Sequence, residues 1–282
     1  MYRGRIAPTP TGLLHVGHAR TFALAAKRAK AAQGQLILRI EDLDVARCRP
    51  EFSAAALSDL KWLGIHWDEG PDIGGLNAPY IQSQRLDWFQ AVWKKLHATG
   101  HLYPCDKSRR EVENALIAPH AEDDSEPVFP LSFRPNQEAG QSATEPGQTN
   151  WRFRVPWGEE ICFHDALQGP QSFTAGKDFG DFLVWRKDGF PAYELAVVAD
   201  DHAMNITEVV RGADLLLSTA RQILLYRALQ WTIPTWAHAA LVVDEKGQRL
   251  AKRSQGLSIQ SLRDKGKTPT EILTQSRSVL QS

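Results

Sequence analysis

The chain has 282 residues, of which 43% are hydrophobic and 23% charged, a composition typical of globular proteins. This length allows one large domain or two modest ones, and the composition excludes disorder, collagen and coiled coil as the main architecture. Lysine and arginine number 33, as do aspartate and glutamate, so the net charge does not favour a polyanionic partner. Any nucleic-acid site must therefore be local.

The cysteines and the apolar segments indicate the compartment. Cys48, Cys105 and Cys162 are an odd number and lie far apart, which argues against a disulfide framework and fits a reducing environment. The N-terminal segment contains no apolar core of signal-peptide length, and no later segment approaches the roughly 18 apolar residues of a membrane helix. We therefore expect a cytoplasmic protein that is neither secreted nor embedded in a membrane.

The N-terminal region predicts a strand, a helix and a second strand. Residues 4–8 are extended, residues 9–12 form a Pro- and Gly-containing turn, and a helix of about four turns then ends at Gly34. The apolar run 35–40 predicts a strand that ends in the acidic segment 41–44. This order is typical of a parallel βαβ unit, so we expect an α/β fold.

The middle of the chain predicts an insertion. Core-facing helices are expected from Pro50 and over residues 86–96, after which the pattern is lost between residues 104 and 182. Within this stretch, residues 111–150 hold eight acidic residues against one basic residue, Arg134. Such a composition is typical of a solvated, partly mobile loop.

From residue 182 the alternation of strands and helices returns. We expect strands at 182–185, 195–199, 208–210 and 239–243, and a helix over 218–228. The expected division of the chain is a catalytic first half (1–104), an inserted subdomain (105–180), a catalytic second half (181–245) and a basic C-terminal segment (246–282).

Both ends of the chain are basic. Residues 1–49 contain nine Lys and Arg against three acidic residues, and residues 246–282 contain eight against two. A basic frame around an acidic insert can present a positive face to a polyphosphate or a nucleic acid. Ordinary scatter of solvated charges explains the same counts equally well.

The segment from Pro8 to His18 predicts an ATP site. It follows the first strand and begins the first helix, where backbone N–H groups and the helix dipole favour a phosphate. Gly17 leaves room for adenine or ribose, and the imidazoles of His15 and His18 can donate to phosphoryl oxygens. Such a site supports attack of a nucleophile on the α-phosphate with Mg²⁺ on the triphosphate. A capped helix with exposed histidines is the ordinary alternative.

A second motif lies far along the chain. Residues 248–254 form a basic stretch flanked by Gly247 and Gly256, which permit motion. A mobile Lys and Arg cluster can close over a triphosphate as pyrophosphate departs. Taken alone, this is a weak signal, because a basic loop is usually only a solvated turn.

Together the two motifs resemble a known family. His15-Val-Gly-His18 and Arg249-Leu-Ala-Lys252 are similar to the two signature motifs of the class I aminoacyl-tRNA synthetases. Residues 5–15, 39–44, 193–201 and 210–215 resemble the glutamyl branch of that family. The resemblance implies a Rossmann-like catalytic domain with an inserted α+β subdomain and a short C-terminal helical remnant.

The resemblance also implies the site residues. Glutamate has two carboxylates and one ammonium, so it needs arginine donors and an anionic partner such as Glu41. The implied catalytic residues are His15, His18 and Lys252. The implied glutamate-binding residues are Arg5, Ala7, Thr9, Glu41, Tyr193 and Arg211, and the implied ATP-binding residues are Pro8, Thr9, Gly12, His15, Gly17, His18, Arg249, Leu250 and Lys252. Surface arginines, an ion-paired glutamate and a packed tyrosine are the ordinary alternatives.

Length favours one group within this branch. Only 30 residues follow Lys252, where glutamyl-tRNA synthetases carry a large anticodon-binding region. This resembles the truncated glutamyl-Q tRNA(Asp) synthetases, which implies activation of L-glutamate by ATP and its transfer to the queuosine base in the anticodon arm of tRNA(Asp). A monomer is expected. The alternatives are a small-molecule nucleotidylyltransferase and a non-catalytic RNA-binding paralogue.

The sequence departs from the family in two places. The family's insert carries a zinc site of the form C-x-C followed by Y-x-x-x-C, but here only Cys105 remains and phenylalanines stand at 129 and 133. One thiolate cannot complete a four-ligand zinc site, so we expect no zinc and apolar packing instead. In the second motif Arg249 and Ala251 stand where Lys and Ser are common, which leaves Lys252 as the main triphosphate contact.

Two aspartates and a histidine that follow one another in the chain have the side chains of a metal site. Asp200, Asp201 and His202 are consecutive, and consecutive residues of a helix do not face one ligand. We expect these side chains to pack or to support the site rather than to bind metal.

Overall fold

The computed structural model describes residues 1–108, 110–112, 128–241 and 258–278. It begins with the expected βαβ unit, in which β1 (Arg3–Ile6) and β2 (Gln35–Leu38) pair in parallel and α1 (Val16–Ala31) connects them. Ala19, Phe22, Ala25 and Ala29 are the buried side chains of α1, as the helical spacing requires. The α/β fold class is therefore confirmed.

A four-stranded sheet, in the order β6-β5-β9-β8, lies beside this pair. Strands β8 (Glu208–Gly212) and β9 (Thr235–Ala239) are parallel, and β5 (Glu160–Asp165) joins β9 while pairing with β6 (Gly169–Thr174) as a hairpin. β1 lies beside β8, where the Thr207 amide donates to the Arg3 carbonyl oxygen at 2.9 Å. The carboxyl ends of β1, β2, β8 and β9 therefore lie along one edge.

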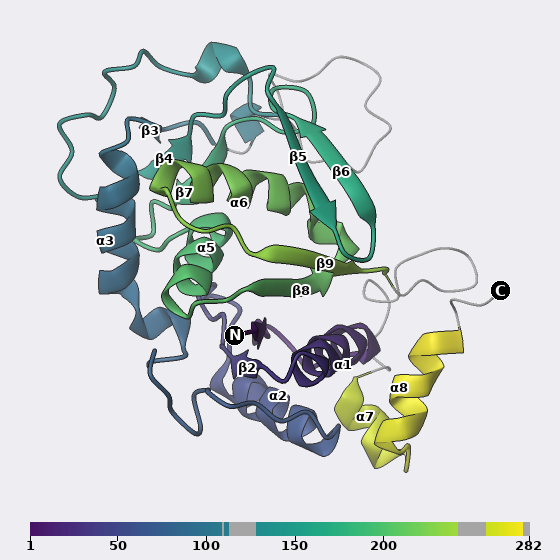
Figure 1. Ribbon diagram of the computed structural model, residues 1–282. Coiled ribbons are helices and arrows are strands. Elements are labelled where there is room, and N and C mark those ends of the chain that lie inside the picture. Colours follow the sequence, from purple (N-terminus) through teal and green to yellow (C-terminus); the bar gives the residue numbers. More distant parts are fainter. Residues whose placement is uncertain (109, 113–127, 242–257, 279–282) are drawn as a thin grey trace.

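Helices cover both faces of this sheet, as Figure 1 shows. One face packs against α1, and the other against α5 and α6, each side with its own cluster of buried apolar residues. The bounds of the remaining helices are α2 (Pro50–Trp62), α3 (Leu86–His97), α5 (Tyr193–Ala203), α6 (Leu216–Leu229), α7 (Ile259–Asp264) and α8 (Pro269–Ser278). The predicted helices from Pro50, over 86–96 and over 218–228 are thus confirmed.

Two of the expected strands are wrong. Residues 195–199 lie in α5 and all five are buried, because α5 is enclosed on every side and shows no apolar stripe. A fully apolar run of this length fits a buried strand equally well. The strand expected at 239–243 is β9, which ends at Ala239. Residues 242 and 243 lie outside the described part of the chain.

The segment between residues 104 and 182 contains more regular structure than the sequence suggested. Strands β3 (Leu102–Cys105), β4 (Asn150–Phe153) and β7 (Phe182–Trp185) form an antiparallel sheet. β4 pairs with β7 and β5 pairs with β9, so backbone hydrogen bonds join this segment to strands that follow it in the chain. Its expected boundaries, 105–180, stay a prediction.

Candidate active site

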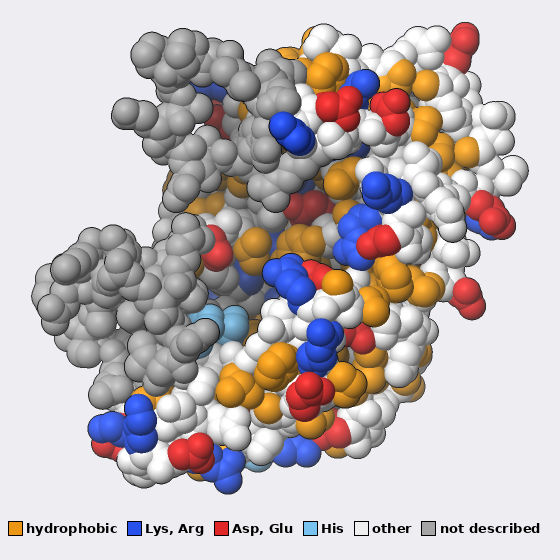
Figure 2. Space-filling model, turned by 180° about the vertical axis from the view of Figure 1, so that it is seen from behind, with side chains coloured by type: hydrophobic (Ala, Val, Ile, Leu, Met, Phe, Trp, Pro, Cys, Tyr) orange, Lys and Arg blue, Asp and Glu red, His pale blue; other side chains and the backbone are white. Residues whose placement is uncertain are grey.

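A cavity of about 400 Å³ opens at the edge where the parallel strands end and α1 begins. Ligands bind at this edge in α/β proteins generally. Seen from behind in Figure 2, the molecule is hollowed here, and histidine side chains border the hollow. The sequence-predicted residues that line the cavity are Arg5, Ala7, Pro8, Thr9, His15, Gly17, His18, Glu41, Tyr193 and Arg211. Gly12 does not line it, and Arg249, Leu250 and Lys252 lie outside the described residues.

His15 and His18 cap the N-terminus of α1 with their own rings. Nδ1 of His15 accepts from the Gly17 amide at 3.1 Å, and Nδ1 of His18 accepts from the His15 amide at 3.3 Å. The two rings stack with their centroids 3.7 Å apart. Two backbone amides at the start of α1, those of the N-cap residue His15 and of Gly17, therefore find partners in imidazole rings.

This capping fixes the protons on both rings. An Nδ1 that accepts a hydrogen bond carries no proton, so a neutral ring must carry its proton on Nε2. Burial lowers the pKa of His15, and burial together with His15 lowers the pKa of His18 to about 3. Both residues are therefore neutral Nε2–H donors at neutral pH, suited to a phosphate.

Gly17 has a local reason to lack a side chain. A Cβ atom at this position would lie 2.9 Å from Cε1 of His15, which is closer than carbon atoms pack. The space beside Gly17 thus holds the His15 ring, a role additional to the expected room for adenine or ribose.

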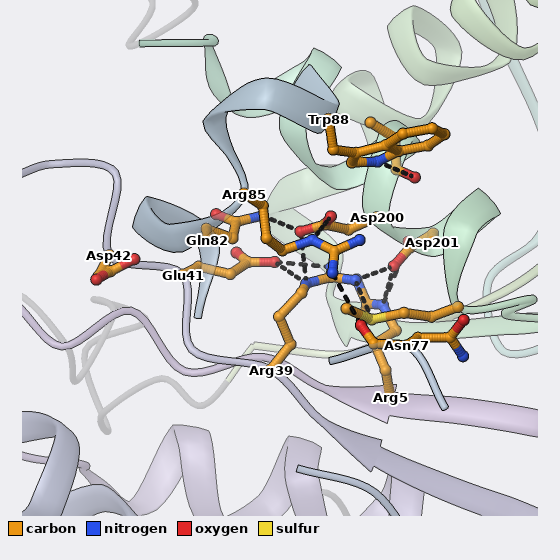
Figure 3. A network of polar contacts seen from close by, with 12 residues as sticks. Arg5, Arg39, Glu41, Asp42, Asn77, Gln82, Arg85, Trp88, Asp200 and Asp201 are labelled. Carbon is orange, nitrogen blue, oxygen red and sulfur yellow. Dashed lines mark hydrogen bonds and ion pairs between the residues drawn. The ribbon is translucent and has the colours of Figure 1, made fainter. Parts of the chain in front are cut away.

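Glu41 follows β2 and is held by a buried arginine. Arg39 is fully buried and donates from Nη2 to Oε1 of Glu41 at 2.9 Å and from Nη1 to Asp201 at 2.7 Å. Asp201 in turn accepts from Nε of Arg5 at 3.4 Å. Figure 3 shows these side chains converging from β1, from the segment after β2 and from α5. One network therefore orients both Arg5 and Glu41.

Asp200, Asp201 and His202 have different partners, and the expectation that they bind no metal stays a prediction. Asp200 accepts from Nε of Arg85 at 2.7 Å and from Gln82 at 3.0 Å. His202 stacks on Trp231 at 3.7 Å. Within the described residues no group of three or more His, Cys, Asp or Glu is placed to hold a metal ion.

Arg211 lies on β8 and lines the cavity together with Tyr193. Its Nη1 lies 3.4 Å from the Tyr193 hydroxyl oxygen, while Nη2 donates to Thr219 at 2.7 Å and Nε to His238 at 3.1 Å. No sequence pattern connects Thr219 or His238 with the site, although Thr219 lies on α6, close to Arg211 along the chain, and His238 lies on β9.

Cys105 lies in an apolar cluster. Tyr103, Cys105, Val112 and Phe129 are buried together, and Phe133 packs edge-on against Phe129 with ring centroids 5.9 Å apart. These contacts suit the expected apolar packing, and the expected absence of zinc stays a prediction.

Two buried histidines make stability depend on pH. Mainly because of burial, the pKa values of His18 and His238 fall from 6.5 to about 3 and about 4. Between these values and 6.5 the unfolded chain binds protons that the folded chain does not, so acidification through this window lowers the free energy of unfolding. Denaturant titrations at pH 7 and pH 5 should show a smaller fall for His238→Gln than for the parent chain. Equal falls would contradict the neutral state of His238.

No helix among the described residues is long and apolar enough to cross a membrane.

Comparisons with known proteins show the family of the chain. The catalytic domain of the class I tRNA synthetases (E and Q) matches residues 1–279. The chain is 46% identical to a glutamyl-Q tRNA(Asp) synthetase of Symbiobacterium thermophilum, over 97% of this chain and 84% of that protein. It is 45% identical to the protein of the same name from Nitratidesulfovibrio vulgaris, over 94% and 82%.

A solved structure is also similar. The crystal structure of a glutamate tRNA ligase from Elizabethkingia meningosepticum, in complex with its amino acid, matches with a TM-score of 0.75 and 31% identity. The match covers 89% of this chain and 52% of that one, so the chain spans about half the length of that ligase. By sequence and by fold, the chain is a ligase-type enzyme that belongs to the class I aminoacyl-tRNA synthetases, in the group of the glutamyl and glutaminyl enzymes.

Proposed function

We propose that the protein activates L-glutamate with ATP and Mg²⁺ to glutamyl-adenylate and transfers the glutamyl group to the queuosine base in the anticodon of tRNA(Asp). The observation that carries the activation step is a single cavity that joins the capping histidines of α1 to Arg5, Glu41 and Arg211. The relatives named glutamyl-Q tRNA(Asp) synthetase support the choice of acceptor.

The histidine end of the cavity suits the triphosphate. The N-terminus of α1 favours negative charge, and the neutral rings of His15 and His18 supply Nε2–H donors. Mg²⁺ prefers phosphate oxygens and few protein carboxylates. The carboxylates of the described lining are Glu41 and Asp214, so the donor set fits an ion carried mainly by the triphosphate, whose charge it would neutralise.

The arginine end suits glutamate. Arg5 and Arg211 are each 4% exposed yet line the cavity, and a guanidinium can bind a carboxylate through two parallel hydrogen bonds. Glu41 supplies the anion for the substrate ammonium. In the first step a carboxylate oxygen of glutamate attacks the α-phosphorus and pyrophosphate leaves. In the second step a hydroxyl of the base attacks the acyl carbon, and AMP leaves with the bonding electrons.

A second cavity supports the entry of a nucleoside from the side of the antiparallel sheet. It has a volume of about 430 Å³ and shares Tyr193 with the first cavity. Arg152 on β4 lines it, with its guanidinium 4.0 Å from the centre of the Phe129 ring. Arginine planes and aromatic rings are the groups on which splayed RNA bases stack.

Replacing Arg152 should separate the two steps. We expect Arg152→Gln to lower glutamyl transfer to tRNA about tenfold, the worth of one charge-assisted contact, with glutamate-dependent pyrophosphate exchange unchanged. Arg227→Gln is the matched control, since Arg227 lines neither cavity and pairs on the surface with Glu159 at 2.9 Å. If Arg152→Gln lowers exchange and transfer equally, the second cavity does not bind the acceptor nucleoside.

Exchange of labelled pyrophosphate into ATP tests the activation step. We expect exchange that requires Mg²⁺ and glutamate and is not supported by glutamine or aspartate. Exchange driven by an unrelated small molecule would favour the nucleotidylyltransferase, and no exchange under any condition would favour the non-catalytic paralogue. A monomeric state, a cytoplasmic location and the absence of zinc belong to the same proposal.

A further inference from the structure

Behind Arg211 lies a buried histidine that touches a buried acid. Nε2 of His238 accepts from Nε of Arg211 at 3.1 Å, and Nδ1 of His238 lies 2.6 Å from Oδ2 of Asp165. The three side chains come from β8, β9 and β5, and both His238 and Asp165 have no exposed surface. Of these three residues, only Arg211 lines the cavity.

The hydrogen bonds define the tautomer of His238. An arginine has donors only, so the imidazole nitrogen that faces it must accept and carries no proton. The proton of the neutral ring therefore lies on Nδ1 and is donated to Asp165. Burial, and next the charge of Arg211, lower the pKa of His238 to about 4, which keeps the ring neutral at pH 7.

Asp165 is held as an acceptor. Its Oδ1 accepts from the amides of Leu167 and Gln168, both at 2.9 Å, and from the His238 amide at 3.1 Å. Although burial raises the pKa of this carboxyl, the hydrogen bonds from His238 and from these amides outweigh burial and lower it. The carboxylate therefore stays ionised and its orientation is fixed by β9 and by the turn after β5.

The consequence for Arg211 is geometric. Nε is occupied by His238, and Nη2 by Thr219 at 2.7 Å and the Leu215 carbonyl at 3.4 Å. The remaining nitrogen, Nη1, points toward the hydroxyl of Tyr193 at the cavity. An arginine fixed in this way presents donors to a ligand and offers no acceptor, which favours a carboxylate over an amide.

We propose that Asp165 and His238 are positioning residues that hold Arg211 in the orientation that binds a carboxylate of the substrate and rejects the corresponding amide. The inference rests on the proposed glutamate activation. Asp165 fixes the tautomer of His238, and His238 in that tautomer fixes the guanidinium.

Asp165→Asn tests the tautomer without removing volume. The Asn side chain can still accept from the turn amides, but its NH₂ group then faces Nδ1 and forces the proton of His238 onto Nε2, where it opposes the Nε–H of Arg211. We expect KM for glutamate to rise about tenfold, the worth of one lost charge-assisted hydrogen bond, and KM for ATP to stay unchanged. Asp178→Asn is the control, because Asp178 accepts from the Thr174 amide beside the same hairpin and does not line the cavity.

Two substitutions of His238 give a second comparison. Gln places an amide near the position of Nε2 and keeps an acceptor for Arg211, whereas Asn reaches only the position of Nδ1. We expect His238→Gln to retain a KM for glutamate close to that of the parent and His238→Asn to resemble Asp165→Asn. Equal rises in both variants would overturn the proposal.

Nitrogen NMR of the histidine rings supplies a readout that does not depend on activity. In the parent chain we expect His238 to carry its proton on Nδ1, and in Asp165→Asn on Nε2. A proton on Nε2 of the parent, or a stability loss in Asp165→Asn with KM for glutamate unchanged, would leave these residues a structural role only and overturn the proposal. If glutamate supports no exchange with the parent chain, the proposed function fails. The protonation of the His238 ring still shows whether Asp165 sets the tautomer of His238.

Discussion

Replacing His18 by Asn is expected to lower glutamate-dependent pyrophosphate exchange by about 10²- to 10³-fold, the usual cost of one donor aimed at developing charge. The Asn oxygen lies near the position of Nδ1, so it can still accept from the His15 amide and preserve the helix cap. What is lost is the Nε2–H donor. The rate constant should therefore fall, while the stability of the chain changes little.

The matched control for this variant is His18→Gln. Its amide reaches the position of Nε2 and can still donate, but it does not reproduce the capping contact. We expect higher activity and lower stability for His18→Gln than for His18→Asn. If activity instead follows stability across the two variants, His18 acts through the cap alone and donates nothing to the triphosphate.

Replacing Arg39 by Met is expected to lower the free energy of unfolding by about 3–5 kcal/mol, the typical result of breaking a buried ion pair from one side. Burial lowers the pKa of Arg39, but the charges of Asp201, Glu41 and Asp200 outweigh this and raise it. Asp200 keeps Arg85 as a partner, whereas Glu41 loses its hydrogen-bonding arginine and Asp201 keeps only the longer 3.4 Å contact with Arg5. Denaturant unfolding of the purified variant measures this loss.

A surface arginine provides the control for this measurement. Arg227 is paired with Glu159 at 2.9 Å, and both side chains are more than 40% exposed, so Arg227→Met should cost less than about 1 kcal/mol. Similar losses in the two variants would mean that the buried network contributes no more than an ordinary surface pair, and that it does not hold Glu41 in place.

Local patterns predicted the elements that begin the fold. The turn at residues 9–12 and the alanine spacing of α1 placed the βαβ unit, and Pro50 placed the start of α2. They failed where burial is complete, since residues 195–199 of α5 are apolar without interruption and buried, so no helical period appears in them. They also failed for the hairpin of β5 and β6, because β5 is held by its pairing with β9, about seventy positions away in the chain.

The candidate site likewise contains residues that the sequence predicted and residues that it did not. The residues that line the cavity were found because Arg5, Glu41 and the His15 motif carry a family resemblance, and the fold brings them together as expected. The residues behind them were not found, because no spacing links Asp165 to His238 or Arg39 to Asp201. Such contacts exist only once the strands and α5 are packed, so they lie beyond what periodicity can show.

The most direct test of the proposed function is the fate of labelled glutamate on tRNA. Bulk tRNA with and without queuosine is incubated with the protein, ATP and Mg²⁺, and the label is then mapped to the anticodon or to the 3′ end. The proposed function predicts label confined to the anticodon of queuosine-containing tRNA(Asp). Label at the 3′ end of tRNA(Glu), or no label on any tRNA while glutamate supports exchange, would contradict the proposed acceptor.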